Sequence, residues 1–335
     1  MPRRSAAEPE LIPPALVERF RADWHAMTGA MIDHVVVAFS GGPDSTALLL
    51  LARAALGDRC RAATVDHALR PESAAEAEAA HAFCQNRGIP HAILSGPLPA
   101  RAKGSANLSA RARALRLSLL EAHRREVGAQ WIATAHHADD QLETIVMRLN
   151  RGSGVAGLAG IRVTNGRLIR PVIEWRRHEL LAIVEAAGLD VVADPTNDDD
   201  RYDRARLRKL LAVSDLLDAD RVAQSARALG RADEALEFCA DMLAGVLIEQ
   251  VGGQVVLATD RLPDELLRRL TLRSLRLIDR HVAPRSDRFN SFVDRLDADL
   301  AATLSGVKGS VSHGERGRLF HFAPAPPRRT EGETP

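Results

Sequence analysis

Apolar and polar positions alternate regularly along the first two thirds of the chain. Short apolar runs rich in β-branched residues, typical of buried strands, are separated by longer segments with apolar residues at helical spacing. The strand-like runs are Val35–Phe39, Arg61–Val65, His91–Leu94, Trp131–Ala135 and Arg167–Arg170. Helices are expected at Asp44–Leu56, Glu72–Arg87, Asn107–Val127 and Asp139–Leu149. This order predicts an α/β fold, with helices on both faces of a parallel sheet.

Polar residues gather where the predicted strands end. The Ser40 loop, Asp66-His67 and Ala135-His136-His137 each follow a strand directly. Right-handed crossovers place the ligand crevice of a parallel sheet at the carboxyl ends of its strands. The three segments are therefore expected on one rim.

The pattern becomes mostly helical after about Val213. Leu216–Glu249 is rich in Ala and Leu, Gln254–Ala258 is typical of one short strand, and Pro263–Arg280 is typical of a helix. The end of the chain is rich in Pro and is expected to be disordered. The predicted parts are an N-terminal extension at 1–30, a nucleotide-binding domain at 31–213, a mostly helical domain at 214–322 and a disordered tail at 323–335.

Composition narrows the class of protein. The 335 residues carry a net charge of +1, so overall charge does not indicate nucleic-acid binding. The three cysteines, Cys60, Cys84 and Cys239, form no Cys-x-x-Cys pair, which argues against zinc or iron–sulfur sites and fits reduced thiols in the cytoplasm. Neither a secretory signal nor an apolar run of membrane-spanning length is present in the sequence.

The first chemical motif follows the first predicted strand. It reads Ser40-Gly41-Gly42-Pro43-Asp44-Ser45, and a helix-forming run comes directly after it. Backbone N–H groups at a helix start have no partner within the helix, so a strand, a Gly turn and a helix form an anion cradle. The loop is neither Gly-x-x-x-x-Gly-Lys-Ser/Thr nor Gly-x-Gly-x-x-Gly. A Gly-rich turn without a ligand is the alternative.

Asp66 and His67 end the second predicted strand. Beside a nucleotide loop, this aspartate is placed to accept hydrogen bonds from ribose or adenine. The alternative is a capping role for the helix expected to begin near Glu72.

The densest polar cluster runs from His136 to Thr144. Asp139 and Asp140 fall in the first turn of a predicted helix, and Glu143 follows at helical spacing, so the three carboxylates share one face. Mg²⁺ binds through one or two such carboxylates together with substrate phosphates. A capped helix with no metal is the alternative.

These motifs together resemble a known family. Ser40–Ser45 resembles the loop of the N-type ATP pyrophosphatases. With Val65–Arg70, His136–Thr144 and Arg151–Leu158, it is similar to the successive motifs of the tRNA(Ile)-lysidine synthetases. Further matches are Arg170-Pro171, Asp194–Asn197 and Tyr202–Arg208, so the resemblance runs from about Val35 to Leu211. Ser109, Leu117 and Ala205 depart from the family pattern and leave details of substrate contact open.

The resemblance implies a two-step ligation. ATP would adenylate the wobble cytidine of tRNA(Ile) with anticodon CAU, and free lysine would then displace AMP and form lysidine. The implied ATP-binding residues are the Ser40–Ser45 loop, Asp66, His67, Arg116 and His136. The implied catalytic residues are Asp44, Asp139, Asp140, Glu143 and Arg113, with Mg²⁺ on Asp44 and Asp140. Arg113 and Arg116 lie three apart and suit the α-phosphate; a solvated basic face is their alternative.

Local arginine clusters indicate RNA contacts. One stripe recurs every three or four residues along the predicted helix at Pro263–Arg280, and a second group follows Asp194–Asn197. Both have the spacing to track phosphates, and an exposed solubilising face is the alternative. The predicted RNA-binding residues are Arg151, Arg204, Arg206, Arg208, Arg269, Arg273, Arg276 and Arg280. The Gly-rich segment Arg151–Leu158 is expected to be a flexible lid or a plain linker.

Two other functions stay open. One is a different tRNA-modifying or amide-forming enzyme with the same loop, and the other is a nucleotide-binding protein without catalysis. The second does not account for the Asp139–Glu143 cluster. No membrane partner is expected, and the oligomeric state, including a homodimer, stays open.

Overall fold

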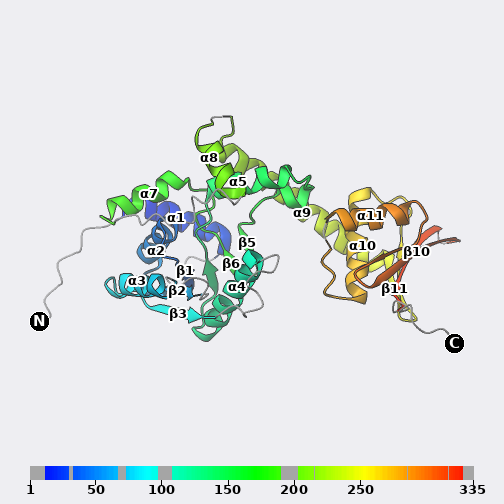
Figure 1. Ribbon diagram of the computed structural model, residues 1–335, viewed down its shortest axis with the longest axis horizontal. Helices are drawn as coiled ribbons and strands as arrows, with labels where there is room; N and C mark the ends of the chain where they lie inside the picture. Colours follow the sequence, from blue (N-terminus) through cyan, green and yellow to red (C-terminus); the bar gives the residue numbers. More distant parts are fainter. Residues whose placement is uncertain are drawn as a thin grey trace, which may run out of the picture. The chain divides into compact units, whose positions relative to one another are not determined.

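The computed structural model describes residues 12–29, 33–66, 73–96, 108–189, 203–214, 216–284, 286–315 and 317–326. The chain divides into two compact units, Met1–Gly230 and Arg231–Pro335 (Figure 1). Each unit has its own sheet and its own apolar core. No described helix is both long and apolar enough to cross a bilayer.

The first unit is built on a six-stranded sheet with the order β3-β2-β1-β4-β6-β5. Its strands are β1 (Val35–Ala38), β2 (Cys60–Asp66), β3 (His91–Ser95), β4 (Trp131–Ala133), β5 (Thr164–Asn165) and β6 (Leu168–Ile169). All pair in parallel except β5, which runs antiparallel to β6. The five expected strands are present and the α/β fold is confirmed. The chain reverses its direction of winding at β1, so a crevice is expected between β1 and β4.

Helices cover both faces of this sheet because successive strand residues point in opposite directions. Val35 and Val37 join a core with α1, α2, α3 and α7, whereas Val36 joins a second core with Leu120 of α4. The helices of this unit are α1 (Pro14–Thr28), α2 (Pro43–Leu56), η1 (Gly57–Arg59), α3 (Ser73–Gln85), α4 (Leu108–Glu126), α5 (Ala138–Leu149), α6 (Val155–Leu158), α7 (Arg177–Ala186) and α8 (Asp203–Ala212).

The N-terminal helix α1 belongs to the first unit, which corrects the prediction of an extension at 1–30. Phe20 and Trp24, four residues apart on one face, are fully buried in its core. Asp23 accepts a 2.8 Å hydrogen bond from Trp175 Nε1, and Arg19 pairs with Glu179 at 2.6 Å. Leu16 and Val17 pack against the same core, so α1 has an apolar face at helical spacing that the prediction overlooked.

The second unit contains a five-stranded antiparallel sheet, order β7-β8-β11-β10-β9, packed on two helices. The expected helices and the strand at Gln254–Ala258 are present, but four further strands correct the mostly helical prediction. The boundary between the units falls inside α9, later than the predicted position at 213. The elements are α9 (Ala219–Leu247), β7 (Ile248–Val251), β8 (Gln254–Ala258), α10 (Asp264–Ile278), α11 (Ser286–Asp297), β9 (Ala302–Leu304), β10 (Val307–Gly314) and β11 (Gly317–Pro324).

The final strand also shortens the predicted tail. Ala323 and Pro324 pair with Lys308 and Val307 of β10, so the range predicted as disordered from 323 begins inside a sheet. Residues 327–335 lie outside the described residues.

Candidate active site at the rim of the parallel sheet

The loop after β1 has the geometry of an anion cradle. Gly41 has a φ of 79°, a left-handed conformation that a residue with a Cβ adopts only under strain. Helix α2 begins at Pro43, whose fixed φ suits the first helical position. Its N-cap, Gly42, makes no side-chain capping bond. Backbone N–H groups of the first turn are therefore available to an anion at the strand end.

Two serine hydroxyls hold this loop in shape. The backbone N–H of Ser40 donates to Ser45 Oγ at 3.2 Å, and the two Oγ atoms lie 3.1 Å apart. Ser45 Oγ also donates to the carbonyl of Gly42 at 2.9 Å. The loop keeps its conformation through its own side chains, so phosphate binding requires little rearrangement.

Helix α5 brings a buried histidine to the same rim. His137 is the N-cap of α5 and is 2% exposed. Its Nε2 lies 3.6 Å from Asp44 Oδ2 and 3.5 Å from Asp140 Oδ2, and its Nδ1 lies 3.6 Å from Asp139 Oδ2. The histidine thus joins the loop aspartate to two carboxylates of α5. His137 was not among the predicted site residues, although its position just before a helix start was the available signal.

The charges of this cluster stabilise one another. Burial disfavours the charged imidazole, but hydrogen bonds to Asp139 and Asp44 and the charge of Asp140 raise the pKa of His137 to about 9. The Asp140 N–H donates to His137 Nδ1 at 3.4 Å and the His137 N–H donates to Asp140 Oδ2 at 3.2 Å, so the capping box of the alternative is present within the cluster. Despite burial, His137, the N–H of Arg177 and the side chain of Arg176 hold the pKa of Asp139 well below its usual range.

Glu143 is held by two arginines of α8. Its side chain is 3% exposed, and its carboxylate pairs with Arg204 Nε at 2.6 Å and Arg208 Nε at 2.7 Å. Arg204 also reaches Asp140 at 2.8 Å. Burial raises the pKa of Glu143, but the two guanidinium groups outweigh it and the pKa is lowered. The arginines predicted to bind RNA at 204 and 208 therefore pair with the acidic cluster, which gives them a role in holding α8 to α5.

The acidic residues fit a magnesium ion that also uses substrate phosphates. Asp44 Oδ1 is buried and has no hydrogen-bond partner among the described residues. Asp44 and Asp140 approach the same nitrogen of His137, so both carboxylates face one small region beside the loop. Within the described ranges no group of three or more His, Cys, Asp or Glu side chains has metal-binding geometry. Such a site would thus depend on ATP for its remaining ligands.

Asp66 lies at the end of β2 as expected. Its carboxylate accepts a 2.7 Å hydrogen bond from Ser73 Oγ at the start of α3, and its carbonyl accepts from Gly96 N at 3.2 Å. This contact joins two side chains and is not a bond to a backbone N–H of α3, so both the capping role and the nucleotide role of Asp66 stay predictions. His67 lies outside the described residues, as do the Asp194–Asn197 motif and Tyr202.

A second set of polar residues lies at the ends of β4 and β6. His136 Nδ1 is 3.0 Å from Thr134 Oγ1. Burial lowers the pKa of His136 to about 4, against the charge of Asp140, and the charges of Arg170 and Arg113 lower it further. Burial and Arg113 also lower the pKa of Arg170 to about 10. Arg113 and Arg116 of α4 are exposed and carry positive charge on this side of the rim. His136, with its lowered pKa, is neutral there at pH 7.

Residues 19–214 match the family model described as a PP-loop domain. The tRNA(Ile)-lysidine synthase of Novosphingobium aromaticivorans is 43% identical over 324 residues, which cover 93% of this chain and 95% of that protein. The tRNA(Ile)-lysidine synthase of Zymomonas mobilis is 39% identical, covering 88% of this chain and 89% of that protein. The chain belongs to the tRNA(Ile)-lysidine synthase family. The resemblance found in the motifs is confirmed, and the PP-loop domain supports ATP binding.

A solved structure shares the fold of this family member. The U34-tRNA thiolase NcsA from Methanococcus maripaludis, determined with its 4Fe-4S cluster, superposes with a TM-score of 0.51 and 17% sequence identity. The match covers 64% of this chain and 79% of that chain. At this identity the likeness supports the PP-loop fold alone.

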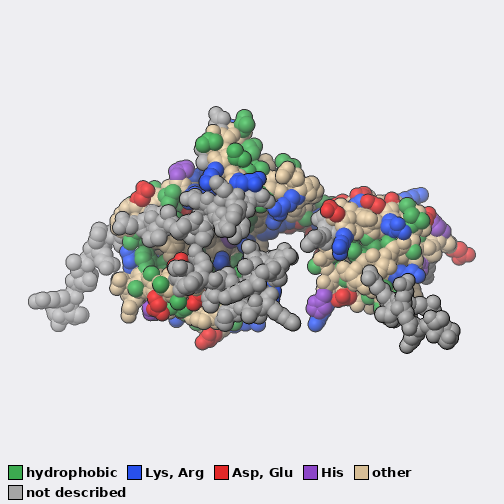
Figure 2. Space-filling view, in the orientation of Figure 1, with side chains coloured by type: hydrophobic (Ala, Val, Ile, Leu, Met, Phe, Trp, Pro, Cys, Tyr) green, Lys and Arg blue, Asp and Glu red, His purple; other side chains and the backbone are tan. Residues whose placement is uncertain are grey.

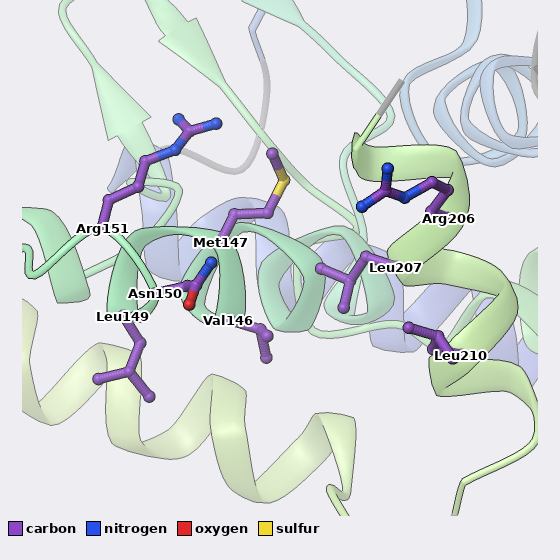
Figure 3. Close-up of a pocket in the computed structure, with 8 residues that line it drawn as sticks. All are labelled: Val146, Met147, Leu149, Asn150, Arg151, Arg206, Leu207 and Leu210. Atoms are coloured by element: carbon purple, nitrogen blue, oxygen red, sulfur yellow. The ribbon is translucent and has the colours of Figure 1, made fainter. Parts of the chain in front are cut away.

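A cavity of about 640 Å³ opens between α5 and α8 of the tRNA(Ile)-lysidine synthase fold. Figure 3 shows Arg151 and Arg206 at its two ends, with Met147 and Leu207 between them. In Figure 2, Lys and Arg side chains gather where α5 and α8 lie in the first unit. Two of the arginines predicted to contact RNA therefore line an apolar hollow beside the acidic cluster.

The Gly-rich segment of the family motif is anchored in this structure. Arg148 Nη1 donates to the carbonyls of Gly157 at 2.6 Å and Gly160 at 2.9 Å. The buried Gln141 accepts from Ile161 N at 2.5 Å and donates to Ile161 O at 3.1 Å. Part of Arg151–Leu158 also forms α6. The half-buried Arg148 therefore holds this segment to α5 at Gly157, and its role as a lid or a linker stays a prediction.

The predicted arginine stripe divides into two pairs. Helix α10 ends at Ile278, so Arg269, Arg273 and Arg276 lie on it and Arg280 lies beyond its end. Arg269 is 8% exposed and is enclosed by Asp233 at 2.6 Å, Glu265 at 2.7 Å and Glu237. Arg273 pairs with Asp241 at 2.7 Å. These two arginines join α10 to α9, and burial corrects the prediction that Arg269 reaches RNA.

The other half of the stripe is less constrained. Arg276 donates to the carbonyl of Val282 at 3.3 Å, and Arg280 contacts His281 at 3.1 Å. Among the described residues no carboxylate lies within salt-bridge distance of either guanidinium. Contact of Arg276 and Arg280 with tRNA stays a prediction.

Proposed function

We propose that this protein is an ATP-dependent ligase that joins lysine to the wobble cytidine of tRNA(Ile) with anticodon CAU. The products are lysidine, AMP and pyrophosphate, and an adenylated cytidine is the intermediate. One observation carries the proposal: the open N-terminus of α2 and the carboxylates of Asp44, Asp140 and Glu143 meet at one rim of a tRNA(Ile)-lysidine synthase fold.

The loop at Ser40–Ser45 binds the pyrophosphate portion of ATP. Its preorganised N–H groups are aimed at the charge that develops as the α–β phosphate bond breaks. The Ser40 and Ser45 hydroxyls fix the loop beforehand, so no reorganisation is needed at the moment of reaction. Arg113, exposed on α4, neutralises the α-phosphate from the other side of the strand ends.

The acidic cluster supports adenylation. Asp44 and Asp140 would hold Mg²⁺, which supplies positive charge to the phosphate oxygens when it is bound. His137 keeps the two carboxylates at their positions. Glu143 holds Arg204 and Arg208 in α8, and this fixes the wall of the site on the side of the α5–α8 cavity.

The tRNA binds beside this wall. Arg151 and Arg206 line the α5–α8 cavity, where their charges suit the phosphates that flank the wobble nucleoside. Arg276 and Arg280 add contacts from the second unit. In this proposal the protein acts in the cytoplasm, where its tRNA, ATP and lysine are found, and a homodimer stays an open prediction.

The test measures pyrophosphate released from ATP in the presence of each substrate. We expect release to require tRNA(Ile) with a CAU anticodon, and AMP to appear stoichiometrically with lysine-modified tRNA. A tRNA with a different wobble base is the matched control and should give no product. Release that needs no tRNA, or a product that contains sulfur or ammonia instead of lysine, would assign the site to another enzyme of the PP-loop class.

A further inference from the structure

Arg170 lies at the carboxyl end of β6, next to the end of β4. The parallel register pairs Ile132 with Leu168 and Ala133 with Ile169, so Thr134 and Arg170 follow side by side. Ile132 and Leu168 belong to the core that packs on α4. Because side chains alternate along a strand, Arg170 points to the same α4 side of the sheet. The loop at Ser40 instead leads into α2, which packs on the opposite face.

The guanidinium of Arg170 is buried and incompletely paired. Its side chain is 4% exposed, and Nη1 donates to the carbonyl of Arg162. Its Nε is buried and has no hydrogen-bond partner among the described residues. Buried polar atoms in folded proteins are almost always paired, and an exception at a site is a sign of a missing ligand. The orphaned donor therefore indicates an acceptor that the described residues do not supply.

The surroundings of Arg170 favour an anion. His136 and Thr134 bond to each other, and the pKa of His136 is lowered to about 4, so the histidine brings no charge at neutral pH. Arg113 adds a second positive charge on the same side. In the described part of the chain no carboxylate is within 4.0 Å of either guanidinium. Arg170 has no carboxylate partner among the described residues, so its charge attracts a negatively charged group.

We propose that Arg170 binds the α-carboxylate of the free amino acid substrate and thereby selects lysine over amines that lack this group. This inference rests on the proposed function, in which lysine is the nucleophile. A planar carboxylate matches the fork of a guanidinium, and the Nε–H is the donor left available. With the carboxylate held at the β6 end, the ε-amine at the other end of the molecule is free to reach the activated cytidine.

Two other anions fit the geometry less well. The phosphates of ATP belong to the loop after β1 and to Arg113, and the sheet order places β4 between β1 and β6. A phosphodiester of tRNA is part of a bulky chain, and a guanidinium that is 4% exposed is enclosed too deeply for it. Arg151, exposed at the end of the α5–α8 cavity, is better placed for that contact.

The experiment compares three nucleophiles with the wild-type protein: lysine, lysinamide and 1,5-diaminopentane. Each has the same reactive amine, and only lysine carries the carboxylate. We expect kcat/KM to fall at least 30-fold for the two analogues, mainly through KM. Equal use of lysine and lysinamide by the wild-type protein would overturn the proposal, and this arm does not depend on the folding of any variant.

The variants locate the effect at Arg170. Arg170→Gln should raise the KM for lysine at least 30-fold and abolish the preference over lysinamide, and Arg170→Lys should recover part of it. Arg167→Gln is the matched control, because Arg167 stacks on Trp131 at the opposite end of β6 and should leave both values unchanged. The second readout is tRNA-dependent pyrophosphate formation without lysine, which should continue at the wild-type rate in Arg170→Gln.

Two other results would show that Arg170 binds a different anion. Loss of lysine-independent pyrophosphate formation with an unchanged KM for lysine would place an ATP phosphate at Arg170. A raised KM for tRNA alone would place a phosphodiester there. Failure of the wild-type protein to use lysine at all would instead refute the proposed function, which is a different result from equal use of lysine and lysinamide.

Discussion

The two units of this protein contain the same kind of helix–helix contact in different surroundings. In the first unit, Arg204 and Arg208 of α8 meet Glu143 of α5. In the second, Arg269 and Arg273 of α10 meet acidic residues of α9. Each contact uses two arginines four residues apart and carboxylates at helical spacing, so sequence patterns alone give the two contacts the same function.

The two units differ in how many of their buried charged groups lack a hydrogen-bond partner. Among the described residues, the charged side chains near the sheet rim that have a buried polar atom without a hydrogen-bond partner all belong to the first unit: Asp44, Arg170 and Arg176. In the second unit the corresponding atom is the hydroxyl of Thr271. Buried charged groups without hydrogen-bond partners at the sheet rim distinguish a binding site from a contact that only holds two helices together.

The largest effect is expected at the loop aspartate. Asp44→Ala removes a carboxylate that faces the phosphate cradle, so pyrophosphate release should fall at least about 1000-fold, roughly 4 kcal/mol of transition-state stabilisation. The circular dichroism spectrum should not change. Asp58→Ala is the control, because this exposed residue pairs with Arg53 at the far end of α2 and should leave the rate intact. Wild-type turnover in Asp44→Ala would remove the loop from the mechanism.

A change at Arg269 should affect stability and leave activity intact. Arg269→Ala leaves Asp233, which is 6% exposed, without its buried partner. Breaking such a pair costs about 3 kcal/mol of unfolding free energy. Denaturant titration of the variant checks the loss, and Arg280→Ala, at an exposed contact, should show almost none. A stable Arg269→Ala protein with weakened tRNA binding would contradict the structural role assigned to the α9–α10 contact.

Glu143→Gln tests the equivalent contact in the first unit. It keeps the shape of the side chain but removes the charge that holds Arg204 and Arg208. We expect the ATP- and lysine-dependent rate to fall at least about tenfold, roughly 1.4 kcal/mol, with an altered Mg²⁺ dependence. Glu121→Gln, which affects a surface pair on α4, is the control. If only the melting temperature changes, the two helix contacts are equivalent after all.

Acid should weaken the first unit through His91. Burial and the charges of His81 and His123 lower the pKa of His91 to about 4, and its Nε2 bonds to Thr64 at 2.8 Å. The unfolded state takes up a proton near pH 6.5 and the folded state only near 4, so stability falls as the pH decreases through this window. We expect a loss of about 2 kcal/mol at pH 5 relative to pH 7. Urea titrations of wild type and His91→Gln check this, and an equal pH slope in both would contradict it.

The smallest effect is expected from Arg276 and Arg280, which have no carboxylate partner among the described residues. The double variant Arg276→Ala, Arg280→Ala should weaken tRNA binding and flatten the log–log salt dependence by about 0.7 to 0.9 per lost contact. ATP affinity should stay constant. Binding measured across a salt series decides between a phosphate contact and a solvated helix face, and an unchanged slope favours the latter.

Strand β1 was predictable because it is buried on both faces and contains the continuous apolar run Val35–Val37. Strand β10 was not, because Val307–Gly314 mixes glycine, lysine and serine and gains its structure only by pairing with β11. The carboxylates of α5 followed from helical spacing. The importance of His137 and Arg170 did not, because it depends on burial and on partners far away in the sequence.

The Gln141 amide has a consequence for the evolution of this chain. It binds both the N–H and the carbonyl of Ile161, as a neighbouring strand would. Gly160 has a φ of 67°, and a Cβ there would come 2.3 Å from the oxygen of the same amide. Any larger residue at 160 must first displace the side chain that anchors the next residue. A substitution at either position alone is therefore expected to free the segment that leads back to the sheet.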